Sequence, residues 1–294
     1  MRHYPVLLPT VLEYLNVDPA GTYVDCTLGE GGYAEAILGR LTSGQLLAID
    51  RDANALEAAK QRLQAFGEKV SFFHASYGEI DSVTRSRQVQ GIVADLGVSR
   101  RQFDTPERGF SLQWEGPLDM RMDQGQSLTA ADIVNHYDER SLADLIFKFG
   151  EERRSRRIAK AIVRSRPIRD TKHLVGVVER AVPRAPQQRI HPATRTFQAI
   201  RIAVNDELAE LEKLLERGPL LLTPGGRMVV VSFHSLEDRP VKQAWRRWAA
   251  RDVVTILTRR VARPSDEEIR ENPPSRSAKL RACERTDTEW QPLN

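Results

Sequence analysis

The chain has 294 residues, of which 40% are hydrophobic and 29% are charged. A chain of this length buries a substantial core and fits one large domain or two smaller ones, and we expect two. No apolar stretch approaches the ~20 residues that a membrane-spanning helix needs, which argues against a membrane partner. The apolar run Val6–Leu8 soon meets Glu13 and no small-residue cleavage site follows, which disfavours a signal peptide and indicates a cytoplasmic protein.

The charge favours polyanionic partners, because the net charge is +4 and the pI is near 9.2. Basic residues concentrate in the stretch 148–169, where the only acids are Glu151 and Glu152. Such a run forms either a solvated helix face or a polyanion-binding surface, and charge alone does not separate the two. The location of the run matters more than the net charge.

The sequence gives no sign of a metal or redox centre. Cys26 and Cys283 are far apart and lack the close partners that a zinc site or redox pair needs, so we predict reduced, unreactive thiols. His191 and His234 also lack close-spaced ligands. We therefore predict no bound metal.

An alternation of strands and helices begins near residue 22. The β-rich stretch Thr22–Cys26 runs into glycines at positions 29, 31 and 32, and Ala34–Leu41 has helical character. Then follow a strand, an alanine-rich helix and two further strands, at Gln45–Asp50, Asn54–Gln64, Val70–His74 and Gly91–Asp95. This order predicts an α/β fold with a Rossmann-like, mostly parallel sheet and helices on both faces.

The alternation stops after residue 95 and resumes with a fifth strand at Arg227–Val231. The stretch between these strands is far longer than one crossover requires. It carries helical patterns at 130–136, 142–149, 154–164, 171–181 and from Pro192 onward. We therefore predict an all-helical domain, residues 106–205, inserted into a sheet domain formed by residues 1–105 and 206–294.

The segment that leaves the insert has apolar residues on one helical face from Phe197 to Leu215. This pattern predicts one long helix that rejoins the sheet through the turn Thr223–Gly226. Beyond the fifth strand we expect a helix, a strand, a proline-rich loop and a last strand, with the three regular elements at Arg239–Ala249, Val253–Leu257 and Lys279–Glu284.

The glycine-rich stretch Asp25–Ala34 (DCTLGEGGYA) lets the backbone turn sharply and a ligand approach closely. Asp50 ends the second strand, where an acid can accept hydrogen bonds from both ribose hydroxyls of a nucleoside cofactor. The segment Gly29–Ala34 also fits the dinucleotide pattern G-x-G-x-x-A, with Asp50 at about the spacing found in NAD enzymes. This local pattern does not separate NAD from S-adenosyl-L-methionine.

Three further features favour S-adenosylmethionine. Asp25 precedes the glycines, where methyltransferases often carry an acid that faces the methionine end of the cofactor. Asp95 ends the fourth strand, where a polar loop usually meets the methyl-accepting amine, and Tyr77 follows the third strand, where an aromatic ring can lie against adenine. An oxidoreductase would also need a catalytic His or Lys pair, and none is evident after the fourth strand.

These motifs resemble the MraW/RsmH family, the enzymes that N4-methylate a cytidine in the decoding region of 16S ribosomal RNA. The matching segments run nearly end to end, at His3–Leu8 (HYPVLL), Asp25–Gly32, Asp95–Asp104 (DLGVSRRQFD), Arg108–Met122, Phe149–Ile162, His191–Asn205, Ser232–Arg239 (SFHSLEDR) and Asn272–Glu284. The resemblance implies an S-adenosylmethionine-dependent rRNA methyltransferase with a class I methyltransferase sheet.

The resemblance also implies which residues contact the cofactor: Gly31, Gly32, Tyr33, Asp50, Tyr77, Asp95 and Gln102. Two positions depart from the family pattern. Tyr33 stands where the family usually has His, so a contact there would run through the backbone. The loop Ser99–Gln102 is more basic than the usual Ser-Ser-Pro-Gln, although Gln102 is kept.

Methyl transfer from a sulfonium is an in-line displacement, so the main task of the protein is to align the amine. Asp95 is the first candidate to accept a hydrogen from N4, with cofactor contact as its alternative role. A flipped base needs apolar or aromatic walls, for which Phe110 and Trp114 are candidates, with core packing as the alternative for Phe110. His234 and Glu237 could orient the base or the phosphate backbone, while capping of the next helix by Ser235, Glu237 and Asp238 is an equal alternative.

The helical insert would then face the RNA, through Arg153, Arg157 and Arg195, with phosphate contacts that make affinity depend on salt. Cations near the end of the chain, at Arg276, Lys279 and Arg281, would extend this surface. The expected partner is 16S rRNA within the small ribosomal subunit. A silent assembly factor and a methyltransferase for protein or lipid are the competing classes, and whether the chain forms a homodimer stays open.

Overall fold

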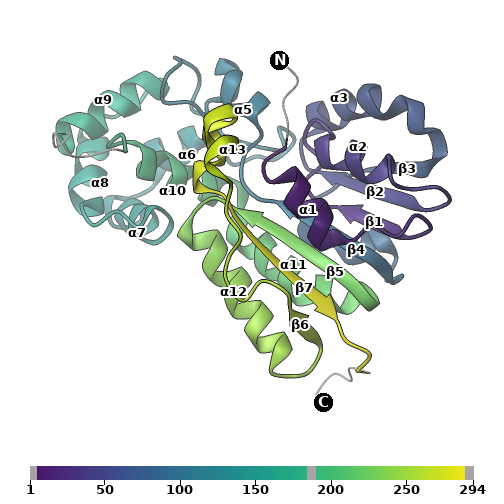
Figure 1. The fold of residues 1–294 in the computed structure, drawn as a ribbon. Coiled ribbons are helices and arrows are strands. Elements are labelled where there is room, and N and C mark those ends of the chain that lie inside the picture. Colours follow the sequence, from purple (N-terminus) through teal and green to yellow (C-terminus); the bar gives the residue numbers. More distant parts are fainter. Residues whose placement is uncertain (1–4, 184–189, 289–294) are drawn as a thin grey trace. The chain divides into compact units, whose positions relative to one another are not determined.

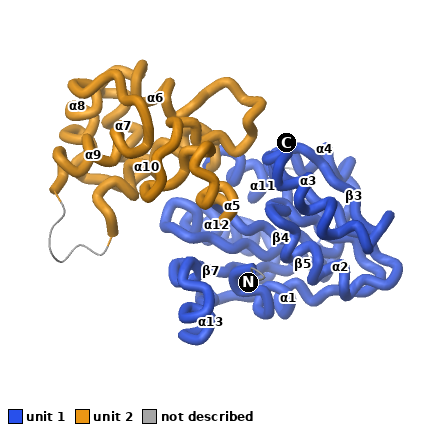
Figure 2. The backbone as a smooth tube through the Cα atoms, turned by 90° about the horizontal axis from the view of Figure 1, so that it is seen from above, with its two compact units in different colours: residues 1–97, 208–294 blue, residues 98–207 orange. Residues whose placement is uncertain are grey.

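The computed structural model describes residues 5–183 and 190–288, and its elements are labelled in Figure 1. The chain forms two compact units, which Figure 2 distinguishes by colour. We call residues 1–97 and 208–294 the sheet unit, and residues 98–207 the helical unit. The loop at residues 98–105, which we assigned to the sheet domain from the sequence, thus groups with the helical unit.

The sheet unit contains one seven-stranded sheet of order β3-β2-β1-β4-β5-β7-β6. The first five strands along the chain pair in parallel, whereas β7 is antiparallel to both of its neighbours. The strands are β1 (Thr22–Asp25), β2 (Gln45–Asp50), β3 (Val70–His74), β4 (Val89–Asp95), β5 (Leu222–Ser232), β6 (Val254–Ile256) and β7 (Lys279–Arg285). The predicted α/β sheet is confirmed, and each strand expected from the sequence forms part of it.

Apolar side chains cover both faces of the sheet, because successive residues of a strand point to opposite sides. Tyr23 of β1 packs in one core and its neighbour Val24 in the other. The first core is closed by helices α1 (Leu8–Leu15), α2 (Gly32–Leu38) and α3 (Ala53–Leu63). The second is closed by α4 (Ile80–Thr84), α11 (Glu207–Leu221) and α12 (Ser235–Ala249). The sheet therefore lies between two helical layers (Figure 1).

The long helix expected from Phe197 to Leu215 is wrong, because the chain breaks at Asp206. This residue has a left-handed backbone (φ 49°) and separates α10 (Thr194–Asn205) from α11. Phe197 packs in the core of the helical unit, whereas Leu215 packs in the second core of the sheet unit. The apolar period continues across the break because each helix has a buried face, although the two faces belong to different cores.

The expected turn at Thr223–Gly226 is part of β5, which begins at Leu222. Gly225 has a positive φ of 75°, a conformation that glycine adopts without a Cβ clash. The register between β4 and β5 shifts between Val89 and Gly91. Gly225 and Gly226 therefore lie at a bulge-like irregularity in the pairing of β5 with β4 and do not form a separate turn. The sequence pattern also missed the short helices α1, α4, α5 (Arg100–Asp104) and α13 (Asp266–Glu271).

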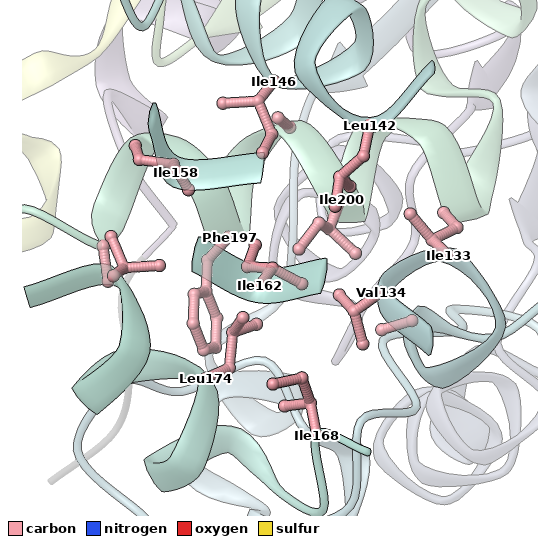
Figure 3. Close-up of a cluster of buried hydrophobic side chains, with 14 of the residues drawn as sticks. Ile133, Val134, Leu142, Ile146, Ile158, Ile162, Ile168, Leu174, Phe197 and Ile200 are labelled. Atoms are coloured by element: carbon pink, nitrogen blue, oxygen red, sulfur yellow. The ribbon is translucent and has the colours of Figure 1, made fainter. Parts of the chain in front are cut away.

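The helical unit contains α5 (Arg100–Asp104), α6 (Ala130–His136), α7 (Glu139–Gly150), α8 (Ser155–Arg164), α9 (Thr171–Ala181) and α10. The helices predicted here are confirmed, two of them at the predicted bounds. Its core draws side chains from α6 to α10, among them Ile146, Ile158 and Leu174, which point toward one another in Figure 3. Within the described residues, no helix is long and apolar enough to cross a membrane.

Neighbouring residues of α7 test how much of the stability of the helical unit comes from this core. Ile146 is fully buried, whereas Phe147 is 59% exposed. We expect Ile146→Ala to lower the free energy of unfolding by about 2–5 kcal/mol, because it leaves a cavity, and Phe147→Ala by less than about 1 kcal/mol. Hydrogen exchange of the α7 and α8 amides measures both. Equal loss of protection in the two variants would contradict the assignment of this core.

Candidate active site at the carboxyl edge of the sheet

The glycine-rich loop joins β1 to α2. Gly29 and Gly31 have positive φ angles of 52° and 80°, a backbone conformation that other residues rarely adopt. Gly32 is limited by space, because an added Cβ would lie 2.3 Å from Cγ of Pro5. A Cβ at Gly29, by contrast, would approach no atom closer than the carbonyl oxygen of Thr27 at 3.9 Å. The loop is therefore tightly packed at Gly32 and open at Gly29.

Asp50, at the end of β2, is hydrogen-bonded to this loop. Its Oδ2 accepts a hydrogen bond from the Gly29 amide at 2.7 Å, and its Oδ1 accepts one from the Asp52 amide at 2.8 Å. Burial raises the pKa of Asp50 to about 6, although both amide donors favour the charged form. A carboxylate has about four lone-pair sites, so each oxygen of Asp50 retains capacity for a hydroxyl donor.

Asp25, which is fully buried, and Asp95, which is partly buried, lie at the ends of the neighbouring strands β1 and β4. The Thr27 amide donates to Oδ1 of Asp25 at 3.1 Å, and the Thr27 hydroxyl accepts from the Asp95 amide at 2.7 Å, which links the two strand ends. Among the described residues, Oδ2 of Asp25 and Oδ1 of Asp95 have no hydrogen-bond partner. Two buried carboxylate oxygens therefore lack donors, which is rare in folded proteins.

The electrostatics of this pair favour a positively charged ligand. Burial raises the pKa of Asp25 to about 7, and the charge of Asp50 adds to the effect. Burial also raises the pKa of Asp95 well above its usual range, and the charges of Asp25 and Glu237 raise it further. A cationic ligand that donates hydrogen bonds would satisfy both carboxylates and reduce their mutual repulsion.

The Tyr33 side chain belongs to the first core of the sheet unit, where it is 3% exposed. Its hydroxyl donates to the carbonyl oxygen of Val6 and also lies within hydrogen-bonding range of Asp95. Burial is the main cause that raises the pKa of Tyr33, followed by the charges of Asp95 and Asp25. The Tyr33 side chain thus packs in the core beside Asp95. The contact expected between the Tyr33 backbone and the cofactor stays a prediction.

Glu237 is a fourth carboxylate near the strand ends, and it caps α12. Its Oε2 accepts from the amides of Phe233 at 2.8 Å and His234 at 3.4 Å, and its Oε1 lies 3.0 Å from Nε2 of His234. Of the two interpretations left open, helix capping therefore describes Glu237. The His234 side chain is held against Glu237, and its contact with RNA stays a prediction.

Two of the three cations expected to extend an RNA-facing surface, Lys279 and Arg281, are instead paired with an acid. Asp238 of α12 pairs with Arg281 at 2.7 Å and with Lys279 at 3.7 Å. The Arg281 side chain is only 11% exposed. Burial alone would raise the pKa of Asp238, but the Arg281 hydrogen bond and the neighbouring cations hold it below its usual value. Both cations therefore serve an internal ion pair, whereas Arg276 is exposed.

Tyr77 begins the short helix η2 (Tyr77–Glu79) just after β3, and it packs partly buried against the second core. The preceding residue, Ser76, is hydrogen-bonded to Glu210 of α11, which positions this loop. The structure thus brings Tyr77, Asp50 and the glycine loop into one sheet unit, at the carboxyl ends of β3, β2 and β1. The contact of the Tyr77 ring with adenine stays a prediction.

The remaining expected site residues belong to the helical unit. Gln102 is buried and its side chain accepts from the Ser99 amide at 3.0 Å, as part of a cap on α5. Phe110 is only 4% exposed and packs against Phe103, with ring centroids 6.5 Å apart. This burial contradicts the expected role of Phe110 as a stacking surface for a base and supports the alternative, core packing. Trp114 is 54% exposed.

The expected RNA-binding arginines are accessible. Arg153 and Arg157 are exposed, with Arg157 on α8 and Arg153 just before it. Arg195 is also exposed, although its guanidinium lies 3.3 Å from the Glu151 carbonyl and 3.7 Å from Glu152. The role of Arg195 is thus partly structural.

Other chemistry finds little support in the described part of the chain. Cys26 and Cys283 are buried free thiols, and burial raises the pKa of each, which disfavours a reactive thiolate. Among residues 5–183 and 190–288, no three His, Cys, Asp or Glu side chains are grouped in a way that suits a metal ion.

An α/β sheet of this order, with a glycine loop and acids at the carboxyl ends of β1, β2 and β4, defines a Rossmann-like class I methyltransferase that uses S-adenosylmethionine. The chain belongs to the MraW methylase family, which matches residues 1–286. This membership excludes the NAD-dependent oxidoreductase considered from the glycine pattern.

Two relatives show how close the family likeness is. Both are called ribosomal RNA small subunit methyltransferase H. The protein of Solibacter usitatus is 52% identical over 285 residues, which cover 96% of this chain and 99% of the relative. That of Acidobacterium capsulatum is 50% identical over 292 residues, covering 97% and 98%. An rRNA methylase structure from Streptococcus thermophilus aligns with 98% of this chain at 14% identity and a TM-score of 0.43, too low to add to the assignment.

The buried acids fit this cofactor. S-adenosylmethionine carries a sulfonium and an ammonium group, and the unpartnered oxygens of Asp25 and Asp95 suit a cation with hydrogen-bond donors. Asp50 suits the ribose hydroxyls.

The pH dependence of stability tests the burial of Asp25. Its folded pKa of about 7 exceeds the usual value, so between about pH 4 and 7 the folded state holds a proton that the unfolded chain has lost. The free energy of unfolding should therefore fall as pH rises through that window, by on the order of 3 kcal/mol. Urea unfolding of the cofactor-free protein from pH 5 to 8 measures the trend.

We expect Asp25→Asn to remove this part of the pH dependence and to be more stable than the wild type at pH 8. Asp18→Asn, at an exposed position before β1, is the matched control and should keep the wild-type profile. Parallel profiles for wild type and Asp25→Asn would show that the carboxyl is not buried in its neutral form.

Proposed function

We propose that the chain transfers a methyl group from S-adenosylmethionine to the exocyclic N4 of a cytidine in the decoding region of 16S rRNA, within the small ribosomal subunit. The substrate class is supported by the relatives, which are called ribosomal RNA small subunit methyltransferase H and are 50–52% identical to this chain. The observation that carries the chemistry is the partly buried Asp95, whose buried Oδ1 has no hydrogen-bond partner among the described residues. The N4 position rests on the family resemblance.

Residues at the carboxyl edge of the sheet would hold the cofactor. Asp50 would accept from the ribose hydroxyls, Asp25 would face the methionine end, and the ring of Tyr77 would lie against adenine. The further contacts would come from Gly31, Gly32, Gln102 and the backbone of Tyr33. When bound, S-adenosylmethionine supplies a methyl group on a positively charged sulfur.

Asp95 would act on the acceptor amine. The N4 lone pair of cytosine is delocalised into the ring, so a hydrogen-bond acceptor for an N4 hydrogen favours its pyramidalisation toward attack. The reaction releases one proton from N4. Burial and the charges of Asp25 and Glu237 raise the pKa of Asp95, which makes its carboxylate a stronger proton acceptor than an ordinary aspartate.

The helical unit would bind the RNA. Arg157, Lys160 and Arg164 recur at intervals of three and four residues, so they form one exposed stripe on α8, opposite the buried Ile158 and Ile162. No acidic partner is described for any of the three. Arg153 and Arg156 add to this stripe, and the exposed Trp114 offers an aromatic surface for a base.

Methyl transfer to small ribosomal subunits that lack the modification tests the reaction. With labelled S-adenosylmethionine, the wild type should give N4-methylcytidine on nucleoside analysis. We expect Asp95→Asn to lower kcat by roughly 10²–10⁴-fold, because the amide cannot take the proton. Asp18→Asn should match the wild type. Cofactor affinity, measured by calorimetry, separates loss of chemistry from loss of binding.

Two results would count against these roles. Full activity of Asp95→Asn would leave Asp95 with cofactor contact alone. Label in another nucleoside, or in none despite cofactor binding, would reject the cytidine N4 assignment and favour another acceptor or a silent assembly factor.

The α8 stripe gives a separate prediction. Arg153→Gln/Arg157→Gln should raise KM for small subunits about 10-fold or more and leave kcat within about twofold, because phosphate contacts contribute to binding equally before and during the reaction. The control is Arg140→Gln/Arg180→Gln, which removes two exposed arginines from α7 and α9. Equal KM values for both double variants would reject a specific role of the stripe.

A further inference from the structure

The exposed residues of α12 are mostly basic, with Gln243 as a neutral exception. Figure 1 shows this helix beside the sheet. Its inward face is formed by Val241, Ala244, Trp245 and Trp248, which are buried in the second core. The residues on the opposite side are exposed, and they include Arg239, Lys242, Arg246 and Arg247, which we call the α12 basic face. The intervals of three and four residues place the first three in one line along the helix.

No acidic residue interrupts the α12 basic face. The helix has two acids, Glu237 and Asp238, and both lie in its first turn. Glu237 is buried against His234, and Asp238 forms its closest ion pair with Arg281, at 2.7 Å. Asp238 also interacts electrostatically with Lys242, but beyond the first turn α12 carries no acid, so cations predominate along the rest of its outer side.

The stability of the helix does not account for this arrangement. Cations are favourable near the C-terminus of a helix, which suits Arg246 and Arg247 in the last turn. The same effect disfavours a cation near the N-terminus, where Arg239 lies, and is absent in the middle, where Lys242 lies. A mostly cationic face thus requires another explanation, and charge complementarity to a polyanion provides one.

The α12 basic face also begins next to the proposed site. The helix starts directly after His234, and Glu237 in its first turn interacts electrostatically with Asp95. With a rise of 1.5 Å per residue, the nine steps from Glu237 to Arg246 span about 14 Å. Phosphates that flank a nucleotide held near Asp95 would thus fall within reach of this helix.

We propose that the α12 basic face binds the phosphate backbone of the RNA substrate beside the target nucleotide, an inference that rests on the proposed function. The sheet unit then contacts RNA itself, in addition to the α8 stripe of the helical unit. These contacts carry no base information, since phosphates are the same in every sequence; they hold the strand in position.

Binding of the full-length protein to small ribosomal subunits at several salt concentrations tests this. Each phosphate contact contributes about 0.7 to 0.9 to the slope of log K against log salt concentration. We expect Lys242→Gln/Arg246→Gln to reduce the magnitude of that slope by about 1.4 to 1.8. The matched control, Arg40→Gln/Arg87→Gln, removes two exposed arginines before β2 and β4, at the opposite edge of the sheet, and should keep the wild-type slope.

Unchanged affinity of Lys242→Gln/Arg246→Gln for S-adenosylmethionine would show that the variant is folded. If the wild type methylates the subunits and both double variants give the wild-type slope, the α12 inference is wrong and the proposed function stands. If the wild type neither binds nor methylates the subunits, the proposed function fails, and the α12 inference fails with it.

Discussion

The site depends on one constraint: the carboxylates of Asp25, Asp50 and Asp95 lie close together at one edge of the sheet, where each is fully or partly buried. Burial away from water disfavours the charged form of each, and proximity adds repulsion between them. Asp25 and Asp95 are held in this arrangement because β1 and β4 pair in register and because Thr27 donates to one and accepts from the amide of the other. Folding alone thus leaves a site that a cation would stabilise, which is the property a sulfonium cofactor requires.

The position of this site follows from how apolar residues are distributed. The sheet buries both of its faces, so polar side chains of its inner strands gather where the strands end. The glycine loop adds the freedom to turn directly after Asp25, and Asp50 ties that turn to the next strand through the Gly29 amide. The rigid sheet therefore fixes three acids from three strands without any of them needing support from a mobile loop.

Much of the fold was predictable because burial of both sheet faces and sharp turns produce recognisable local sequence patterns. Central strands such as β2 read as continuous apolar runs, and the glycine loop with Asp50 identified the carboxyl edge. The break at Asp206 was not predictable, because the apolar period is the same whichever core a helix faces. Nor was the burial of Phe110, since an aromatic residue in a polar loop looks the same in a core as at a surface.

The charged residues show a similar limit. Arg281 and Arg157 are both cations near other cations in sequence, yet Arg281 is enclosed by Asp238 of α12, whereas Arg157 is exposed on α8. Sequence proximity cannot reveal a partner that lies 43 residues away. A similar limit applies to α12, which was predicted as a helix but not as a basic surface. Its sequence has two acids and four cations, and only the fold shows that Glu237 is buried and that Asp238 pairs with Arg281.

This separation explains how a chain of modest net charge can present strongly basic surfaces. Several acids of the described residues are engaged in partly buried pairs, such as Glu207 with Arg201 at 2.8 Å and Glu284 with Arg227 at 2.7 Å. Acids held in this way contribute little to the outer potential of α8 and α12. The net charge of +4 therefore understates the attraction that an RNA backbone would meet at either helix. Each unit of the chain therefore has its own basic helix face, α8 in the helical unit and α12 in the sheet unit, although the chain as a whole carries little net charge.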